Sequence, residues 1–247
     1  MNFVLVGVAR LSRPATFATL RDNKLFSGIT LMTELWLMRH GETDWNIVHR
    51  LQGWRDIGLN NTGLGQAARL ADRLATEGKA HTFHAAYSSD MARTVNTLAP
   101  AAARLGLPVE TTPTLRERHY GSLEGLTVDE LSLRAAPAAY RAWSEREIDG
   151  DVGGGETLRT FHERIVGAVD AIAQRHSGER VLVMTHGGAL DIIWRYIQGI
   201  SLAAKARRAR MLNASINIVQ VDDTAWRVKT WGDVAHMTAP VGNDVVA

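Results

Sequence analysis

The sequence predicts one α/β domain built on a mostly parallel sheet, and three observations support this fold class. From Leu35 onward, short apolar runs alternate with longer amphipathic segments, which is the pattern of strands separated by helices. The first run, residues 35–38, is apolar throughout, as expected for a strand buried on both faces of a parallel sheet. The 247 residues are 45% hydrophobic and 22% charged and contain no internal repeat or Pro-rich linker, so a single core is expected.

Four further segments have the character of strands. Residues 84–87 form a weak apolar run and residues 181–185 form the strongest one in the chain. Residues 216–221 and 226–230 alternate polar and apolar side chains with period two and flank a short polar turn. This pattern predicts a hairpin late in the sequence.

Two helices are expected in the first half of the domain. Thr62 can cap the first, because apolar residues recur at helical spacing from there to about residue 74. The second is expected over residues 91–105, with capping side chains in Ser88-Ser89-Asp90. Pro100 lies within it as a kink or a break.

Two more helices flank the strand at 181–185. An apolar stripe over residues 158–172 predicts a helix that ends before Ser177-Gly178. Another begins after Gly187-Gly188 and runs towards Gly199. The alternation of strands and helices therefore extends through most of the chain.

The charge distribution argues against nucleic-acid binding. Residues 1–31 carry four basic residues and one acidic residue, whereas the rest of the chain carries 24 basic and 25 acidic residues. A nearly neutral body lacks the field needed to bind a polyanion. Residues 1–31 are interpreted as an N-terminal extension, unstructured or the product of an over-long start, because Met32 stands three residues before the first strand.

The composition favours a cytoplasmic protein that does not bind membranes. No run reaches the roughly 18 consecutive apolar residues of a membrane span. No basic residue precedes the apolar start of the chain, as an export signal would require. The chain has no Cys, which excludes disulfides, thiolate metal sites and cysteine nucleophiles.

Chemically capable side chains follow three of the predicted strands. Arg39 and His40 follow the first strand, Arg93 lies in the first turn of the helix after the second, and His186 follows residues 181–185. Ligands of open α/β sheets bind outside the carboxyl ends of the strands, so these side chains are expected to meet at one edge. Guanidinium groups and an amide-rich helix N-terminus can hold a phosphate, and a neutral imidazole can attack phosphorus. The pattern indicates a phosphate site.

These residues belong to a series of short motifs that occur in order along the chain. The motifs are Arg39-His40-Gly41-Glu42-Thr43 with Trp45-Asn46, Gln52-Gly53, Asp56 and Leu59 ahead of Thr62-Gly63, Ser88-Ser89 with Arg93, Leu115-Arg116-Glu117 with Gly121, and Thr185-His186-Gly187-Gly188. Over about residues 35–221 the chain thereby resembles the phosphatase branch of the histidine phosphatase superfamily, also called the phosphoglycerate mutase-like family. The resemblance implies a domain over residues 32–247, folded as a three-layer α/β/α sandwich with a helical lid insertion at about 125–155.

The resemblance also implies roles for individual residues. His40 would be the nucleophile that becomes a phosphohistidine, Arg39, Arg93 and His186 would bind the transferred phosphoryl group, and Glu117 would be the general acid. Further residues would bind the substrate, namely Asn46, Gln52, Gly53 and Gly187. No metal and no other cofactor is implied. Phosphoryl transfer depends mainly on positioning and charge stabilisation, and these residue types supply both.

The acid that protonates the leaving alcohol has two candidates. Burial would favour the neutral form of Glu117 and nearby guanidinium groups the ionised form, so the balance stays open. Glu124 is a rival carboxylate close by in sequence. The match to Leu115-Arg116-Glu117 favours Glu117.

The function expected from the resemblance is a phosphomonoesterase that hydrolyses a small phosphorylated metabolite. The alternatives are a cofactor-dependent phosphoglycerate mutase and a non-catalytic module that binds phosphate. Residues 125–155 carry three basic and six acidic residues, which would repel a trianionic mutase ligand, and Gly187-Gly188 stands where those mutases typically have Gly-Asn. Hydrolysis is therefore expected to prevail. Selectivity is expected from this lid, with Tyr140 and Trp143 as candidate contacts, while the substrate and the existence of a homodimer stay open.

Overall fold

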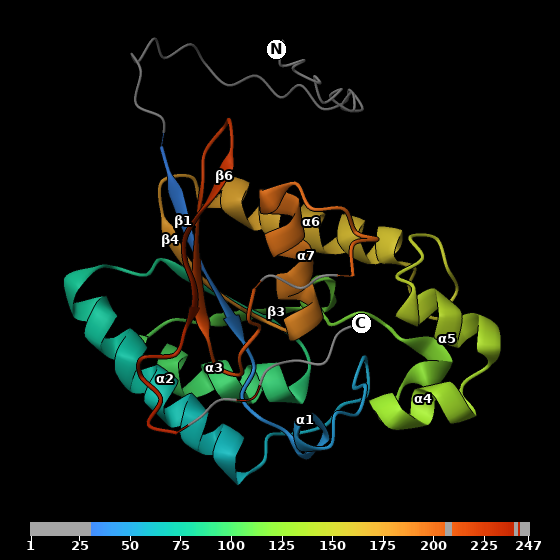
Figure 1. The fold of residues 1–247 in the computed structure, drawn as a ribbon. Coiled ribbons are helices and arrows are strands. Elements are labelled where there is room, and N and C mark those ends of the chain that lie inside the picture. Colours follow the sequence, from blue (N-terminus) through green and yellow to red (C-terminus); the bar gives the residue numbers. More distant parts are fainter. Residues whose placement is uncertain (1–30, 206–208, 240–241, 243–247) are drawn as a thin grey trace, which may run out of the picture.

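The computed structural model describes residues 31–205, 209–239 and 242, and its centre is a six-stranded sheet with the order β3-β2-β4-β1-β5-β6 (Figure 1). The strands are β1 (Thr33–Arg39), β2 (Ala85–Ser89), β3 (Val109–Thr112), β4 (Arg180–Thr185), β5 (Ile216–Val221) and β6 (Trp226–Asp233). Strands β3, β2, β4 and β1 are parallel, while β5 and β6 are antiparallel to their neighbours. The predicted α/β fold with a mostly parallel sheet is confirmed.

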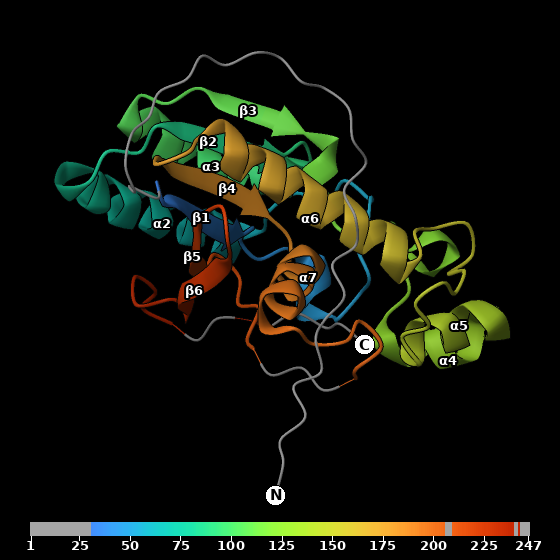
Figure 2. The ribbon, with the colours of Figure 1, turned by 90° about the horizontal axis from the view of Figure 1, so that it is seen from above.

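Helices cover both faces of the sheet, as Figure 2 shows. They are α2 (Asn61–Ala80), α3 (Ala92–Leu105), α6 (Leu158–Arg175) and α7 (Gly187–Gln198). Alternate side chains of β1 enter the two layers: Leu35 and Leu37 pack with apolar residues of α6 and α7, and Trp36 and Met38 pack with those of α2 and α3. The run is apolar at every position because both of its faces are buried.

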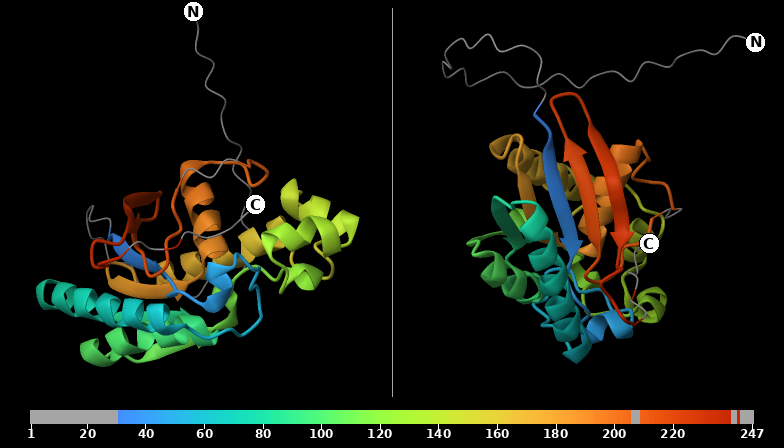
Figure 3. Two further views of the ribbon diagram at one scale, coloured as in Figure 1. Left: turned by 60° about the horizontal axis from the view of Figure 1, so that its bottom comes forward. Right: turned by 90° about the vertical axis from the view of Figure 1, so that its left-hand side faces the viewer.

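Short helices in the region predicted as a lid lie to one side of the sheet (Figure 3). They are α4 (Val128–Arg134) and α5 (Pro137–Ser144). Thr127 caps α4 in a capping box with Glu130, and Pro137 occupies the first position of α5. Both helices contribute to a separate apolar cluster that includes Trp143, which explains why this region forms a distinct lobe.

The cap of α2 differs from the prediction. Thr62 lies inside the helix, and the N-cap is Asn60, whose Oδ1 accepts a hydrogen bond from the Gly63 amide at 2.8 Å. A side chain at Gly63 would lie 2.1 Å from the carbonyl oxygen of Glu42. The Thr62-Gly63 motif therefore reflects the close approach of α2 to the segment after β1.

The cap predicted for α3 is also wrong. Ser88 and Ser89 belong to β2, and Met91 is an N-cap without a side-chain cap. Asp56 supplies the cap from a distant loop, since its Oδ1 accepts a hydrogen bond from the Ala92 amide at 2.8 Å. The helix continues through Pro100 without a break.

The edge strand β3 was not predicted from the sequence. It has no apolar run, because two of its four residues are exposed, so its sequence lacks the signal of a buried strand. The remaining elements are short: α1 (Asp44–Ile47), η1 (Pro113–Leu115) and η2 (Gly121–Leu123). The predicted extension, residues 1–31, lies outside the described residues except for Leu31.

Candidate active site

The carboxyl ends of β1, β2 and β4 bring the predicted side chains to one edge of the sheet. Arg39 ends β1, Arg93 lies in the first turn of α3 after β2, and His186 is the N-cap of α7 after β4. Because β2, β4 and β1 are adjacent and parallel, these three positions meet. The rings of His40 and His186 are in edge contact, with centroids 5.3 Å apart.

His40 is buried and held in one orientation, with 3% of its surface exposed. Its Nδ1 lies 2.7 Å from the carbonyl oxygen of Gly41, so Nδ1 carries the proton and Nε2 carries the lone pair. The backbone is fixed as well, because the His40 carbonyl accepts hydrogen bonds from Asn213 Nδ2 at 3.1 Å and from the Ala214 amide at 3.2 Å. Burial, together with the charges of Arg93 and Arg39, lowers the pKa of His40 well below 6.5. The ring is therefore neutral at neutral pH.

The two arginines are buried with their guanidinium groups anchored on backbone carbonyls. Arg93 is fully buried and donates to the carbonyls of Arg55 at 2.9 Å and Gly53 at 2.8 Å. Arg39 donates to the carbonyl of Met211. The carbonyl partners hold both guanidinium groups in place at the edge of the sheet, and guanidinium groups there suit a site for a phosphoryl group.

His186 lies beside Arg93 and contacts β2. Its Nε2 is 2.9 Å from the hydroxyl oxygen of Ser89, and Arg93 Nε donates to its Nδ1 at 3.3 Å. Burial is the main cause that lowers its pKa well below 6.5, and the charge of Arg93 adds to this effect. Ser89 therefore orients His186, and this explains the second serine of the Ser88-Ser89 motif.

Glu117 faces the same site and is held by two backbone amides. Its Oε2 accepts a hydrogen bond from Gly188 in the first turn of α7, and its Oε1 accepts one from Arg118, each at 2.8 Å. A Cβ atom on Gly188 would lie 2.2 Å from Glu117 Oε1. The second glycine of Gly187-Gly188 is therefore required by the close approach of this carboxylate.

A small pocket opens above these groups. Its lining includes Arg39, His40, Arg93 and Glu117, together with the predicted substrate-binding residues Asn46, Gln52 and Gly53. Gly187, the fourth predicted substrate-binding residue, lies in the first turn of α7 beside His186. Most of the predicted set thus lines one pocket.

Several pocket residues were missed by sequence reasoning. His49, Arg50, Leu51 and Tyr120 also line the cavity. They lie in irregular segments, where no periodicity indicates which way a side chain points. His49 has a positive φ of 51°, which gives the chain a local turn that the sequence does not signal.

Glu124, the rival acid, has a different environment. Its Oε1 accepts hydrogen bonds from the amides of Trp54 at 2.9 Å and Tyr120 at 3.1 Å. Gly53 passes directly over it, because a Cβ on Gly53 would lie 2.1 Å from Glu124 Oε1. Glu124 therefore supports the loop that carries Gly53, while Glu117 lines the pocket.

Asn46 and Thr97 have supporting contacts that the sequence did not reveal. Asn46 Oδ1 accepts hydrogen bonds from the Thr43 amide at 3.0 Å and from Asn213 Nδ2 at 3.4 Å. Thr97 accepts a hydrogen bond from the Gly41 amide at 2.9 Å and donates to the Arg93 carbonyl at 2.6 Å. These contacts couple the loop after β1 to α3.

The lid residues expected to contact the substrate lie elsewhere. Trp143 is buried in the apolar cluster formed by α4, α5 and neighbouring loops, and Tyr140 packs against the same cluster. Neither residue lines the His40 cavity.

Within the described segments, no group of three or more His, Cys, Asp or Glu side chains could hold a metal ion. No helix in the described part of the chain has the length and hydropathy needed to cross a bilayer.

The comparisons with known proteins point to the class that the site suggests, which is enzymes that process phosphate esters through histidine. Residues 35–234 match the histidine phosphatase superfamily, branch 1. The chain is 41% identical over 210 residues to a metal-independent phosphoserine phosphatase from Arabidopsis thaliana, covering 84% of each protein. It is 39% identical over 208 residues to phosphoglycerate mutase-like protein 4 from the same plant, covering 83% of this chain and 86% of the relative.

Solved structures agree with this result. The protein YhfR of Bacillus stearothermophilus shares 33% identity at a TM-score of 0.72, covering 83% of this chain and 98% of that structure. A mycobacterial glucosyl-3-phosphoglycerate phosphatase shares 27% identity at a TM-score of 0.67, covering 81% and 99%. The chain belongs to the histidine phosphatase superfamily, as the sequence motifs predicted. The predicted enzyme class, a phosphoric monoester hydrolase, is confirmed.

Proposed function

We propose that the protein is a phosphomonoesterase that transfers a phosphoryl group from a small metabolite to His40 and then to water. The observation that carries this proposal is the orientation of His40. Its Nδ1 donates a hydrogen bond to the Gly41 carbonyl, and the lowered pKa of the ring keeps Nε2 unprotonated beside two buried arginines. A neutral imidazole nitrogen held in this way is an activated nucleophile.

The residues of the pocket divide the reaction between them. Nε2 of His40 attacks phosphorus as the bond to the ester oxygen breaks, and Arg39, Arg93 and His186 stabilise the charge on the phosphoryl oxygens. Protonated Glu117 gives its proton to the leaving alkoxide, which departs as an alcohol. Water then attacks the phosphohistidine and passes a proton to Glu117. The phosphorus–nitrogen bond breaks, and phosphate and neutral His40 are regenerated.

The substrate is proposed to be a small phosphate ester that carries further polar groups. Asn46, Gln52, Gly53 and Gly187 are proposed to bind it, and Gln52 Oε1 is buried without a hydrogen-bond partner among the described residues. The relatives named as phosphatases for phosphoserine and for glucosyl-3-phosphoglycerate make these two esters the first candidates. A cytoplasmic location, which the cysteine-free composition favours, belongs to the same proposal.

Mutase activity is the second candidate, and one observation favours it more than the sequence suggested. The acidic residues of the lid do not line the His40 cavity. Glu145 and Glu147, for example, pair with Lys205 at 2.6 Å and Arg141 at 2.9 Å. The negative lid therefore gives no electrostatic reason to reject a trianionic ligand, and relatives named phosphoglycerate mutase-like share up to 39% identity. Hydrolysis stays the proposal, but the charge of the lid does not support it.

A phosphate-release screen tests the proposal directly. Phosphoserine, glucosyl-3-phosphoglycerate, 3-phosphoglycerate and a chromogenic ester are compared, with an enolase-coupled mutase assay run in the presence of bisphosphoglycerate. Hydrolysis of at least one ester, faster than mutase turnover, is expected. Faster interconversion of phosphoglycerates would establish the mutase instead. Binding without turnover of any ester would establish the non-catalytic module.

A further inference from the structure

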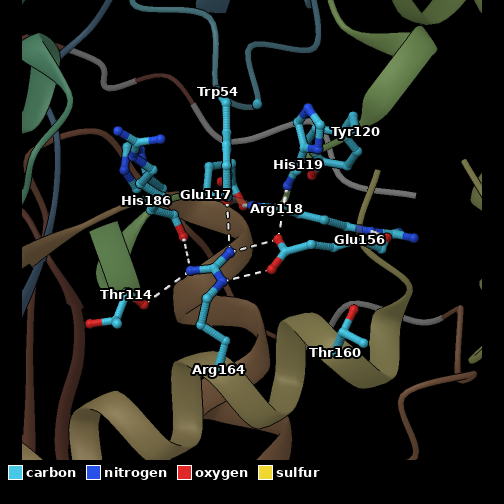
Figure 4. Close-up of polar contacts among 12 residues, drawn as sticks. Trp54, Thr114, Glu117, Arg118, His119, Tyr120, Glu156, Thr160, Arg164 and His186 are labelled. Atoms are coloured by element: carbon cyan, nitrogen blue, oxygen red, sulfur yellow. Dashed lines mark hydrogen bonds and ion pairs between the residues drawn. The ribbon is translucent and has the colours of Figure 1, made fainter. Parts of the chain in front are cut away.

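Arg164 of α6 is the centre of a hydrogen-bond network beneath the segment that carries Glu117 (Figure 4). Its Nη1 donates to the carbonyls of Thr114 at 3.0 Å and Arg116 at 2.9 Å, and its Nη2 donates to the carbonyl of Glu117 at 3.0 Å. The side chain is 18% exposed. A planar guanidinium with fixed donors is suited to holding several carbonyls at once.

Glu156 fixes the guanidinium in turn. Arg164 Nε and Nη2 each donate to one carboxylate oxygen of Glu156 at 2.6 Å. The same carboxylate accepts a hydrogen bond from the His119 amide at 3.0 Å, on the other side of Glu117. Arg164 and Glu156 thus hold the chain both before and after Glu117. The carboxylate offsets part of the guanidinium charge, although the charge of Arg164 is still among the lesser causes that lower the pKa of His186.

The segment needs this clamp because it has no regular structure of its own. Residues 116–120 lie between η1 and η2 and belong to no helix or strand. The carbonyl of Glu117 accepts hydrogen bonds from Arg164 and from Trp54 Nε1, the latter at 2.8 Å. The side chain of Glu117 is held separately by the amides of Gly188 and Arg118. Four contacts, three of them from distant parts of the chain, therefore define where its proton can be delivered.

We propose that Arg164, locked by Glu156, is a positioning residue for the general acid. It acts through the backbone of Glu117. The inference rests on the proposed role of Glu117. An acid must lie within hydrogen-bond reach of the leaving oxygen, and a misplacement of about 1 Å can cost roughly 100-fold in rate.

The test exploits the different demands of good and poor leaving groups. An alkyl phosphate needs protonation of its leaving oxygen, whereas p-nitrophenyl phosphate releases a stable anion without help. Because kcat/KM reports only steps up to the first irreversible one, it isolates phosphorylation of His40 from the later hydrolysis. We expect Arg164→Met to lower kcat/KM for the alkyl ester by roughly 10- to 100-fold and that for the nitrophenyl ester only a few-fold.

Matched variants separate positioning from general damage. Arg159→Met removes a more exposed bidentate ion pair on the same helix, in which Arg159 donates to Asp149 at 2.7 and 2.9 Å, and should leave turnover of both esters unchanged. Arg164→Lys keeps the charge but lacks the planar fork, so it should show the same selective loss. Glu156→Gln should show it more weakly, and it carries the test if both Arg164 variants fail to fold.

The outcomes distinguish this inference from the proposed function. Glu117→Gln should reproduce the selective loss, and an equal loss on both esters in that variant would overturn the role of Glu117 itself. A selective loss in Glu117→Gln, with equal or no loss in the folded Arg164 and Glu156 variants, would overturn the positioning role alone. Selective loss in all of them supports the inference.

Discussion

Replacing Gly188 by alanine should separate activity from stability, because the new methyl group meets Glu117 directly. The added Cβ would lie 2.2 Å from Oε1 and 2.9 Å from the carboxyl carbon, whereas ordinary contact begins at 3.4 Å. The carboxylate must therefore retreat by about 1 Å, the scale at which misplacement costs roughly 100-fold in rate. We expect kcat/KM for alkyl phosphates to fall by that order.

The free energy of unfolding should fall by at most about 3 kcal/mol, so the variant should still fold. Overpacking costs typically about 1–3 kcal/mol, while replacing glycine by alanine in a helix recovers up to about 1 kcal/mol. Urea unfolding and phosphate release measure the two effects on the same preparation. Gly167→Ala is the matched control, because Gly167 lies in α6 with nothing within 4 Å of an added Cβ. That variant should gain a few tenths to about 1 kcal/mol and keep full activity.

The result that would refute this reasoning is a folded Gly188→Ala protein that retains most of its alkyl phosphatase activity. Glu117 would then tolerate displacement, and the two amide hydrogen bonds that hold it would not contribute to the catalytic rate. A large loss of stability with normal activity would show instead that the helix, and not the carboxylate, moves to accept the methyl group.

Three further predictions follow from the site and its caps. His40→Ala should abolish both turnover and the acid-labile, base-stable phosphoprotein, and substantial residual phosphatase activity would show that His40 is not the nucleophile. The unfolding free energy should fall as the pH drops below 6.5, because the pKa values of His40 and His186 lie below that value in the folded protein and the unfolded chain then binds more protons. The slope should reach at most about 1.4 kcal/mol per pH unit for each histidine and should be smaller in His40→Asn, as urea titrations at several pH values can measure. Asp56→Ala removes the cap of α3 and should cost about 1 kcal/mol in the same assay, whereas an unchanged midpoint would mean that water replaces the cap.

The sequence predicted the sheet because its buried strands have strong patterns. The segments around Leu35 and Val181 are apolar at every position, and helices pack on both faces of the strands they form. The strand β3 was missed because Val109–Thr112 lies at the sheet edge and is half exposed. A pattern of burial can predict only the elements that are buried.

The caps of the helices were mispredicted for a related reason. The α3 cap comes from Asp56, 36 residues before the amide it satisfies, so no local pattern could reveal it. The α2 cap was local but two residues earlier than expected, because Asn60 and Thr62 are both competent caps. Asn is the stronger N-cap of the two, and the Asn60 side chain and amide also donate hydrogen bonds to Glu42.

The catalytic candidates were predictable because parallel strands deliver their carboxyl ends to one place. Arg39, Arg93 and His186 each follow a strand whose position in the sheet the sequence suggests. Glu117 follows no such rule, since its place depends on Gly188, Trp54 and a guanidinium from α6. The groups proposed to bind phosphate are thus fixed by the sheet, whereas the proposed acid is fixed by groups from separate elements. Substitutions around Glu117 should therefore alter the preference among leaving alcohols while phosphate binding is preserved.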